Sequence, residues 1–299
     1  MTKILSADAP ADTTDETTQC VRVGFFRKFF HRRLNARIGA TLMVLFVAAA
    51  LLGMVWTPYD PLAVDFAQRL LPPSAAHWIG TDQFGRDVLS RLLVGARESL
   101  AISSISVLFA AMIGTVVGAT AGYFGGAVDR AVTIVMDALM AFPSLMLALG
   151  IVAVLGPGRN GVIIALAVSY SPGVARIVRS TALSLRQREF VAAARSLGKS
   201  NLRILADHVV PNCVAPLTVL STSLFATALL SESALAFLGL GVPPPNPTWG
   251  GMLAETKQFA TSAPWLVLAP GLVISSALLA ANLLGDALRD YFDPRMSTE

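Results

Sequence analysis

Charged residues are scarce in this sequence of 299 residues, because aspartate, glutamate, lysine and arginine make up only 14% of it. An average soluble domain carries roughly 25%. Hydrophobic residues make up 54%. This balance excludes an ordinary soluble domain and predicts an integral membrane protein. The formal net charge of +4 is small, so no nucleic-acid partner is expected, and the positive charges are interpreted as topology signals.

The sequence also lacks the residue sets that enzymes use. Its two cysteines, Cys20 and Cys213, have no metal-ligand spacing, and a disulfide between them is not expected because they flank different apolar runs. No GxxxxGK[ST] phosphate loop is present. Asp82 and Asp87 have no nucleophile–base pair or metal cluster beside them. We therefore expect no catalytic, cofactor-binding or metal-binding residues, and this chain cannot be an ATPase.

Six apolar runs are long enough to cross a bilayer, which takes about 20 helical residues. Pro143 predicts a kink in the third run, and Pro270 with Gly271 predicts a distortion early in the sixth. A proline-rich, aromatic segment before the sixth run predicts a structured outer loop. The expected fold class is an all-α integral membrane protein with six transmembrane helices. The runs are 38–56, 100–124, 131–155, 161–178, 213–235 and 264–284.

Lysines and arginines are unequally distributed between the connecting segments. If the N-terminus is cytoplasmic and six spans alternate, the inner segments hold 17 of them and the outer segments six. This bias fits the positive-inside rule and predicts that both termini are cytoplasmic. The predicted organisation is a cytoplasmic tail at 1–37, a first span and outer loop at 38–98, a transmembrane domain at 99–288 and a cytoplasmic tail at 289–299. Within the first tail, the basic and aromatic segment 22–37 is expected to lie on anionic lipid.

The segment 186–211, named here the knob, is a cationic interruption on the predicted inner side. Glu189 falls in the first turn of a short helix, where a negative charge suits the helix dipole. Gly198 is a natural helix end. A second short helix follows, which cannot continue normally through Pro211. The sequence therefore predicts a helix–turn–helix projection.

The first knob helix has an apolar stripe of Phe190, Ala194 and Leu197. It also has a run of small side chains that a second protein could approach closely. These are Ala192, Ala193 and Ala194.

Glu189, the alanine run, Gly198 and Pro211 have the spacing of the EAA loop of ABC importer permeases, which this knob resembles. Other segments are similar to the permeases for dipeptides, oligopeptides and nickel. Before the second run stands GTDxxGRDxxSR, on Gly80, Thr81, Asp82, Gly85, Arg86, Asp87, Ser90 and Arg91. The chain closes on a segment like NLLGDxLRDxLDPR, on Asn282, Gly285, Asp286, Leu288, Arg289, Asp290, Asp293, Pro294 and Arg295. The outer loop matches at Pro244, Trp249, Gly250 and Met252.

The resemblance implies a type I ABC importer permease fold in the bacterial cytoplasmic membrane. It implies that the knob, through Glu189, Gly198 and Pro211, docks on a cytoplasmic ATPase. The implied partners are a second permease subunit, two ATPase subunits that use ATP and Mg²⁺, and an extracytoplasmic binding protein. The implied cargo is a dipeptide or longer peptide.

Two acidic residues fall inside predicted spans, Asp137 in the third and Glu232 near the outer end of the fifth. A charge in a membrane span is a candidate functional residue by default. Asp137 either forms a helix-packing ion pair or takes part in translocation. Glu232 either lines a cavity or contacts a binding protein. The rival hypothesis is an ion-coupled secondary transporter that uses both acids.

Overall fold

The computed structural model describes residues 34–292, where the regular secondary structure is helical apart from one isolated β-bridge between Thr81 and Asp87. The long helices are α2 (Leu34–Val55), α3 (Val88–Phe124), α6 (Arg159–Arg186), α9 (Val214–Phe237) and α11 (Trp265–Phe292). The shorter ones are α4 (Gly126–Met140), α5 (Ser144–Leu155), α7 (Glu189–Ser196), α8 (Asn201–Ile204) and α10 (Trp249–Thr256). Residues 1–33 with Cys20, most of the basic segment 22–37, and the closing Asp293, Pro294 and Arg295 lie outside the described residues.

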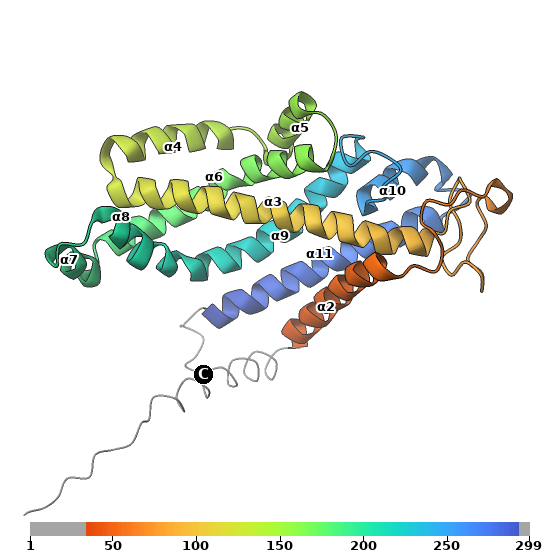
Figure 1. Cartoon of the computed structure of the whole chain (residues 1–299), viewed down its shortest axis with the longest axis horizontal. Helices are drawn as coiled ribbons and strands as arrows, with labels where there is room; N and C mark the ends of the chain where they lie inside the picture. Colours follow the sequence, from red (N-terminus) through yellow and green to blue (C-terminus); the bar gives the residue numbers. More distant parts are fainter. Residues whose placement is uncertain (1–33, 293–299) are drawn as a thin grey trace, which may run out of the picture.

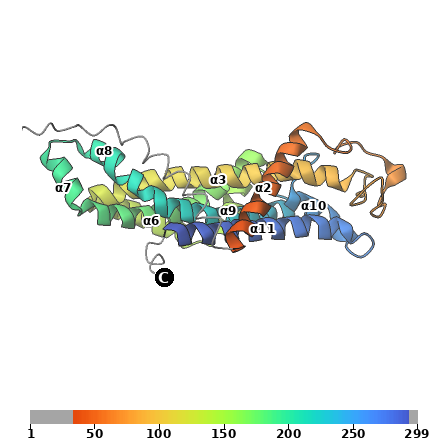
Figure 2. The same ribbon diagram turned by 90° about the horizontal axis from the view of Figure 1, so that it is seen from below.

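The molecule is elongated, with the knob at one end and the loop before α3 together with α10 at the other (Figure 1). Five helical segments are long and apolar enough to cross a bilayer, or six if α4 and α5 form one broken span. In Figure 2, α2 crosses α11 obliquely at the edge of the bundle. The prediction of an all-α membrane protein is confirmed, with a third span that is broken.

The third span departs furthest from its predicted form. The sequence predicted one kinked helix over 131–155, but α4 and α5 meet at 90°. Pro143 occupies the N-cap of α5 with an extended ψ of 132°. A proline disfavours helical backbone in the residue before it and supplies no N–H for the preceding turn, so the chain bends fully there.

The fourth span is longer than predicted. The expected range 161–178 ended near the arginines, whereas α6 covers 28 residues from Arg159 to Arg186. Arg176 and Arg179 lie within the helix because each pairs with an aspartate of α4. The prediction that the span ends near Arg176 and Arg179 is therefore wrong.

The second knob helix does not continue regularly through Pro211, which confirms the prediction, but the chain stays helical. One helical run continues from Asn201 to Phe237, through a π-helical turn η2 (Leu205–Val209) and a 3₁₀ turn η3 (Pro211–Cys213). The Val210 N–H donates to the Leu205 carbonyl at 2.9 Å. The Asn212 side chain donates to the His208 carbonyl at 2.6 Å. These bonds replace part of the ladder that a proline interrupts.

Pro270 does not break α11 either, although a distortion was predicted. The proline leaves the carbonyl of Leu266 without its usual intrahelical donor. The hydroxyl of Thr256, at the end of α10, shares its one proton between the Met252 carbonyl at 2.6 Å and the Leu266 carbonyl at 3.2 Å. A polar partner from another helix therefore keeps the span continuous.

A glycine seam brings α3 and α6 close together. Gly114, Gly118 and Gly122 recur every four residues and so lie on one face of α3. A Cβ added to Gly118 would lie 2.4 Å from the carbonyl oxygen of Ala175, and one added to Gly122 would lie 2.5 Å from that of Arg179. Small residues allow this close approach in a membrane, so the seam positions α6 and the knob that follows it.

Candidate functional site

The first knob helix begins at Glu189 as predicted and presents two different faces. Val191 and Ala194 are buried, whereas Ala192 and Ala193 are exposed. The predicted stripe of Phe190, Ala194 and Leu197 is therefore not the buried face. Only its alanine packs inward, because the knob rests on the bundle through Val191 and Ala194 and points its larger apolar side chains outward.

Gly198 ends this helix through a Schellman motif. Its φ is +78°, and its N–H donates to the Arg195 carbonyl at 3.0 Å. The N–H of Lys199 donates to the Ala194 carbonyl at 3.2 Å. This pair of bonds requires a left-handed residue, which glycine adopts without strain.

The base of the knob is fixed to the membrane helices by an apolar cluster and a tyrosine. Val191, Ile204 and Val209 are fully buried in a cluster that includes Tyr123 of α3 and Val178 of α6. The side-chain amide oxygen of Asn201 accepts a hydrogen bond from the Tyr123 hydroxyl at 3.0 Å. Motion of α3 or α6 is therefore transmitted to the knob through packed contacts.

The outer surface of the knob is unusually apolar for a loop. Leu197 is 83% exposed, Leu202 is 70% exposed and Phe190 is 42% exposed. Arg195 and Lys199 lie near these side chains in the chain, and Pro211 is also exposed. An exposed apolar group rimmed by charge is typical of a protein-docking surface.

Glu232 lies where three helices meet at the end of the bundle away from the knob. Its side chain is 1% exposed, and one carboxylate oxygen is within 3.4 Å of the Ser233 hydroxyl. Ser99 on α3 and Thr248 at the N-cap of α10 lie beside it. The carboxyl group therefore lies between α3, α9 and α10, while Oε1 has no hydrogen-bond partner among the described residues.

Asp137 forms an ion pair rather than standing alone in the span. Its Oδ1 lies 2.7 Å from Nη2 of Arg176, and both side chains are 56% exposed. Asp129, two turns earlier in α4, pairs with Arg179. An ion pair is what the helix-packing interpretation expects, and the exposure leaves a role in translocation open.

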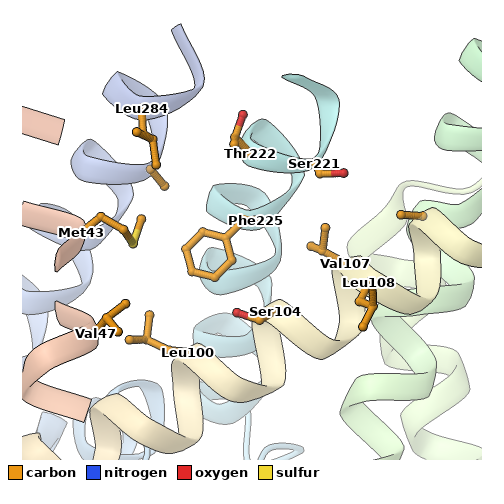
Figure 3. A pocket seen from close by; sticks show the side chains of 12 residues that line it. Met43, Val47, Leu100, Ser104, Val107, Leu108, Ser221, Thr222, Phe225 and Leu284 are labelled. Carbon is orange, nitrogen blue, oxygen red and sulfur yellow. The ribbon is translucent and has the colours of Figure 1, made fainter. Parts of the chain in front are cut away.

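An apolar cavity of about 430 Å³ lies between α2, α3, α9 and α11. In Figure 3, Phe225 of α9 projects into it between Met43 and Val107. Its polar side chains are Ser104, Ser221 and Thr222. Neither Asp137 nor Glu232 lines it, so it does not unite the two acids that the sequence singled out.

A family model described as the binding-protein-dependent transport system inner membrane component matches residues 114–298. The chain belongs to this family. The dipeptide transport system permease protein of Alkalihalophilus pseudofirmus is 43% identical over 263 residues, covering 88% of this chain and 86% of that protein. The nickel transport system permease protein of Escherichia coli is 41% identical over 271 residues, covering 91% and 98%.

The fold agrees with this assignment. A solved structure of the MetNI methionine ABC transporter in an inward-facing conformation matches with a TM-score of 0.54 and 18% identity. The match covers 68% of this chain and 96% of that one. The predicted type I permease fold is confirmed, and the chain is a multi-pass inner-membrane subunit of an ABC importer. The rival ion-coupled transporter is not supported.

In this permease the GTDxxGRDxxSR segment forms a buried ion cluster. Arg86 and Arg91 both contact Asp82, at 2.7 and 3.3 Å, and both donate to Glu255 of α10, at 3.0 and 2.9 Å. Asp87 caps α3 by accepting from the Ser90 N–H at 2.8 Å. The arginines are 6% and 1% exposed, so the motif fixes the outer loop to α3 and α10.

Sequence reasoning missed Glu255, the residue that closes this cluster. The motif holds two arginines and two aspartates, so its own charge balance did not point to a further acid. The chain position of Glu255, more than 160 residues away, could not be read from the pattern.

Proposed function

We propose that this permease carries dipeptides or oligopeptides into the cell within a complex of four kinds of subunit. The others are a second, related permease, two cytoplasmic ATPases and an extracytoplasmic binding protein. The ATPases bind and hydrolyse ATP with Mg²⁺, and this chain performs no chemistry. Both termini and the knob are cytoplasmic in this proposal, and the loop 57–87 is extracytoplasmic.

The observation that carries the proposal is the knob, which combines an exposed apolar surface with a rigid base. Leu197 is 83% exposed at its tip, whereas Val191 is fully buried at its base. A docking surface must offer apolar area to its partner and resist deformation when that partner moves. We assign Glu189, Ala192, Ala193, Gly198 and Pro211 to this surface, with Ala194 seating it on the bundle.

Coupling follows from the connections of the knob. It lies between α6 and α9, and its base also touches α3. When the two ATPases close on ATP, the knobs of both permeases are drawn together, and the attached spans rock as units. The pathway thereby alternates between an inward and an outward opening. Asp137 and Glu232 need carry no coupled ion.

The cargo is proposed from the names of relatives, which include both dipeptide and nickel systems. A direct test reconstitutes the full complex in vesicles and measures uptake of a labelled dipeptide. The proposal expects uptake with ATP and no ion gradient, and none with a gradient and no ATP. Competition by an unlabelled dipeptide but not by Ni²⁺ supports the cargo.

The opposite results are equally clear. Uptake that needs only an ion gradient overturns the ATP-driven mechanism. Uptake of Ni²⁺ with ATP, unaffected by excess dipeptide, overturns the cargo while leaving the mechanism intact.

A further inference from the structure

Four charged side chains form a track between α4 and α6 on the knob side of the bundle. Asp129 and Asp137 lie on α4, two turns apart, and Arg179 and Arg176 on α6 pair with them. The track holds two carboxylates and two guanidinium groups, so its formal charge is zero.

The track lies at membrane depth. Gly118 of α3 packs against Ala175, the neighbour of Arg176. Gly118 belongs to the uncharged run 100–124 and lies six residues from its end, which is roughly 9 Å along a helix. A half-exposed ion pair at this level does not face hydrocarbon, because charged side chains in a membrane face protein or water.

The space beside Arg176 is open in this chain, because a Cβ added to Gly173, one turn before Arg176, meets nothing within 4 Å. The opposite face of α4 is apolar and exposed, with Val135 at 54%, so α4 separates a polar side from an apolar one.

We propose that Asp137 and Arg176 line the water-filled, knob-side half of the transport route and contact the ammonium and carboxylate groups of a passing zwitterionic peptide, those of its side chains included. This inference rests on the proposed function. A neutral pair suits such a cargo, since the guanidinium can receive its carboxylate and the aspartate its ammonium group. When no peptide is present, Asp137 and Arg176 form an ion pair with each other, so neither leaves an unpaired charge in the membrane.

The first experiment measures water access in the assembled complex. Gly173→Cys and Gly150→Cys are made separately after Cys20 and Cys213 are changed to serine. Both glycines have open space around an added Cβ, but Gly150 lies on the apolar, exposed α5 surface with Met146 and Val154. A charged methanethiosulfonate should modify Gly173→Cys at least tenfold faster. Equal rates, or no reaction at Gly173→Cys until the complex is denatured, overturn the proposal.

The second experiment asks whether the pair contacts cargo. Asp137→Asn should lower ATP-driven uptake of a lysine-containing dipeptide relative to a glutamate-containing one by about fivefold, which is about 1 kcal/mol. Arg176→Gln should move the same ratio in the opposite direction. Dividing by the wild-type ratio removes the preference of the binding protein. A purely structural pair would lower both uptakes equally, and that result overturns the proposal.

These outcomes are distinct from failure of the proposed function. If the wild-type complex shows no ATP-driven peptide uptake, the proposed function fails. If uptake is normal and the two variants leave the ratio unchanged, only the role of the charged track fails.

Discussion

The hydroxyl of Tyr123 lies 3.0 Å from the side-chain oxygen of Asn201, 78 positions later in the chain. The bond joins the last turn of α3 to the first residue of the second knob helix. Arg195, in the first knob helix, reaches the same hydroxyl at 3.4 Å. One phenol group therefore links a membrane span to both halves of the surface that we assign to the ATPase.

Tyr123→Phe should loosen the knob without unfolding the bundle. The variant keeps the packed ring but removes the hydroxyl, and the lost hydrogen bond contributes about 1 kcal/mol to the stability of the knob. We expect reduced ATP-driven uptake with a normal amount of permease in the membrane. Tyr59→Phe, which removes a hydroxyl bonded to the Ala76 carbonyl in the outer loop, is the control. Equal uptake by the two variants would refute the coupling role of Tyr123.

Substitutions of Gly198 should impair coupling to the ATPase least for asparagine, more for alanine and most for aspartate. The position has a φ of +78° and open space around it, so the effect is conformational rather than steric. Alanine costs about 1 kcal/mol in this conformation, and asparagine costs less. Aspartate adds a negative charge at a helix C-terminus, where the dipole is unfavourable. Uptake and copurification of the ATPase are the measurements, and a firmly attached ATPase with normal uptake in the aspartate variant would contradict the assignment.

Gly118→Ala should separate α3 from α6. The new methyl group would lie 2.4 Å from the Ala175 carbonyl oxygen, and overpacking of this kind typically costs 1–3 kcal/mol. Gly150→Ala, where nothing lies within 4 Å, is the matched control. Thermal unfolding in detergent, followed by size-exclusion chromatography, should show a lower midpoint for Gly118→Ala alone. An unchanged midpoint would mean that the seam relaxes without cost.

Glu255→Ala should destabilise the outer end of the bundle by roughly 3 kcal/mol, because it leaves Arg86 and Arg91 with Asp82 as their shared partner. Glu98→Ala breaks a pair at 3.4 Å whose arginine, Arg159, is 41% exposed, and should cost under about 1 kcal/mol. The same unfolding assay compares them. If Glu98→Ala lowered the stability as much as Glu255→Ala, the proposed contribution of the ion cluster to stability would be contradicted.

The proposed orientation can be tested with single cysteines in a cysteine-free background. Ala75 lies exposed in the outer loop and Ala206 lies exposed in the knob. A membrane-impermeant thiol reagent should label Ala75→Cys in intact cells and Ala206→Cys only after the membrane is opened. The reverse pattern would invert the topology.

Much of this architecture follows from local sequence. The apolar runs located the spans, and Gly198 marked the helix end because a left-handed residue there has one favoured identity. The kink at Pro143 was foreseen, but its size was not, since a 90° bend depends on how α4 and α5 pack on α6. The residues that join the spans escaped prediction for the same reason.

Proline was the least reliable signal, because its effect depends on distant partners. Pro270 would disturb an isolated helix, yet Thr256 supplies the donor that Leu266 loses. Pro211 would end one, yet a π-helical turn and Asn212 carry the chain past it. The pairing of Asp137 with Arg176 is likewise a contact between two spans. Local patterns give the chemistry of such residues but not their neighbours.

The length of α3 has a mechanical consequence. Its 37 residues extend about 55 Å, well beyond the roughly 30 Å of hydrocarbon in a bilayer. Arg91 anchors one end in the outer ion cluster, and Tyr123 holds the knob at the other. If this rod pivots about its middle by about 10°, its ends swing about 5 Å in opposite directions. A push from a protein bound outside and a pull from one bound inside would then act on the two arms of a single lever.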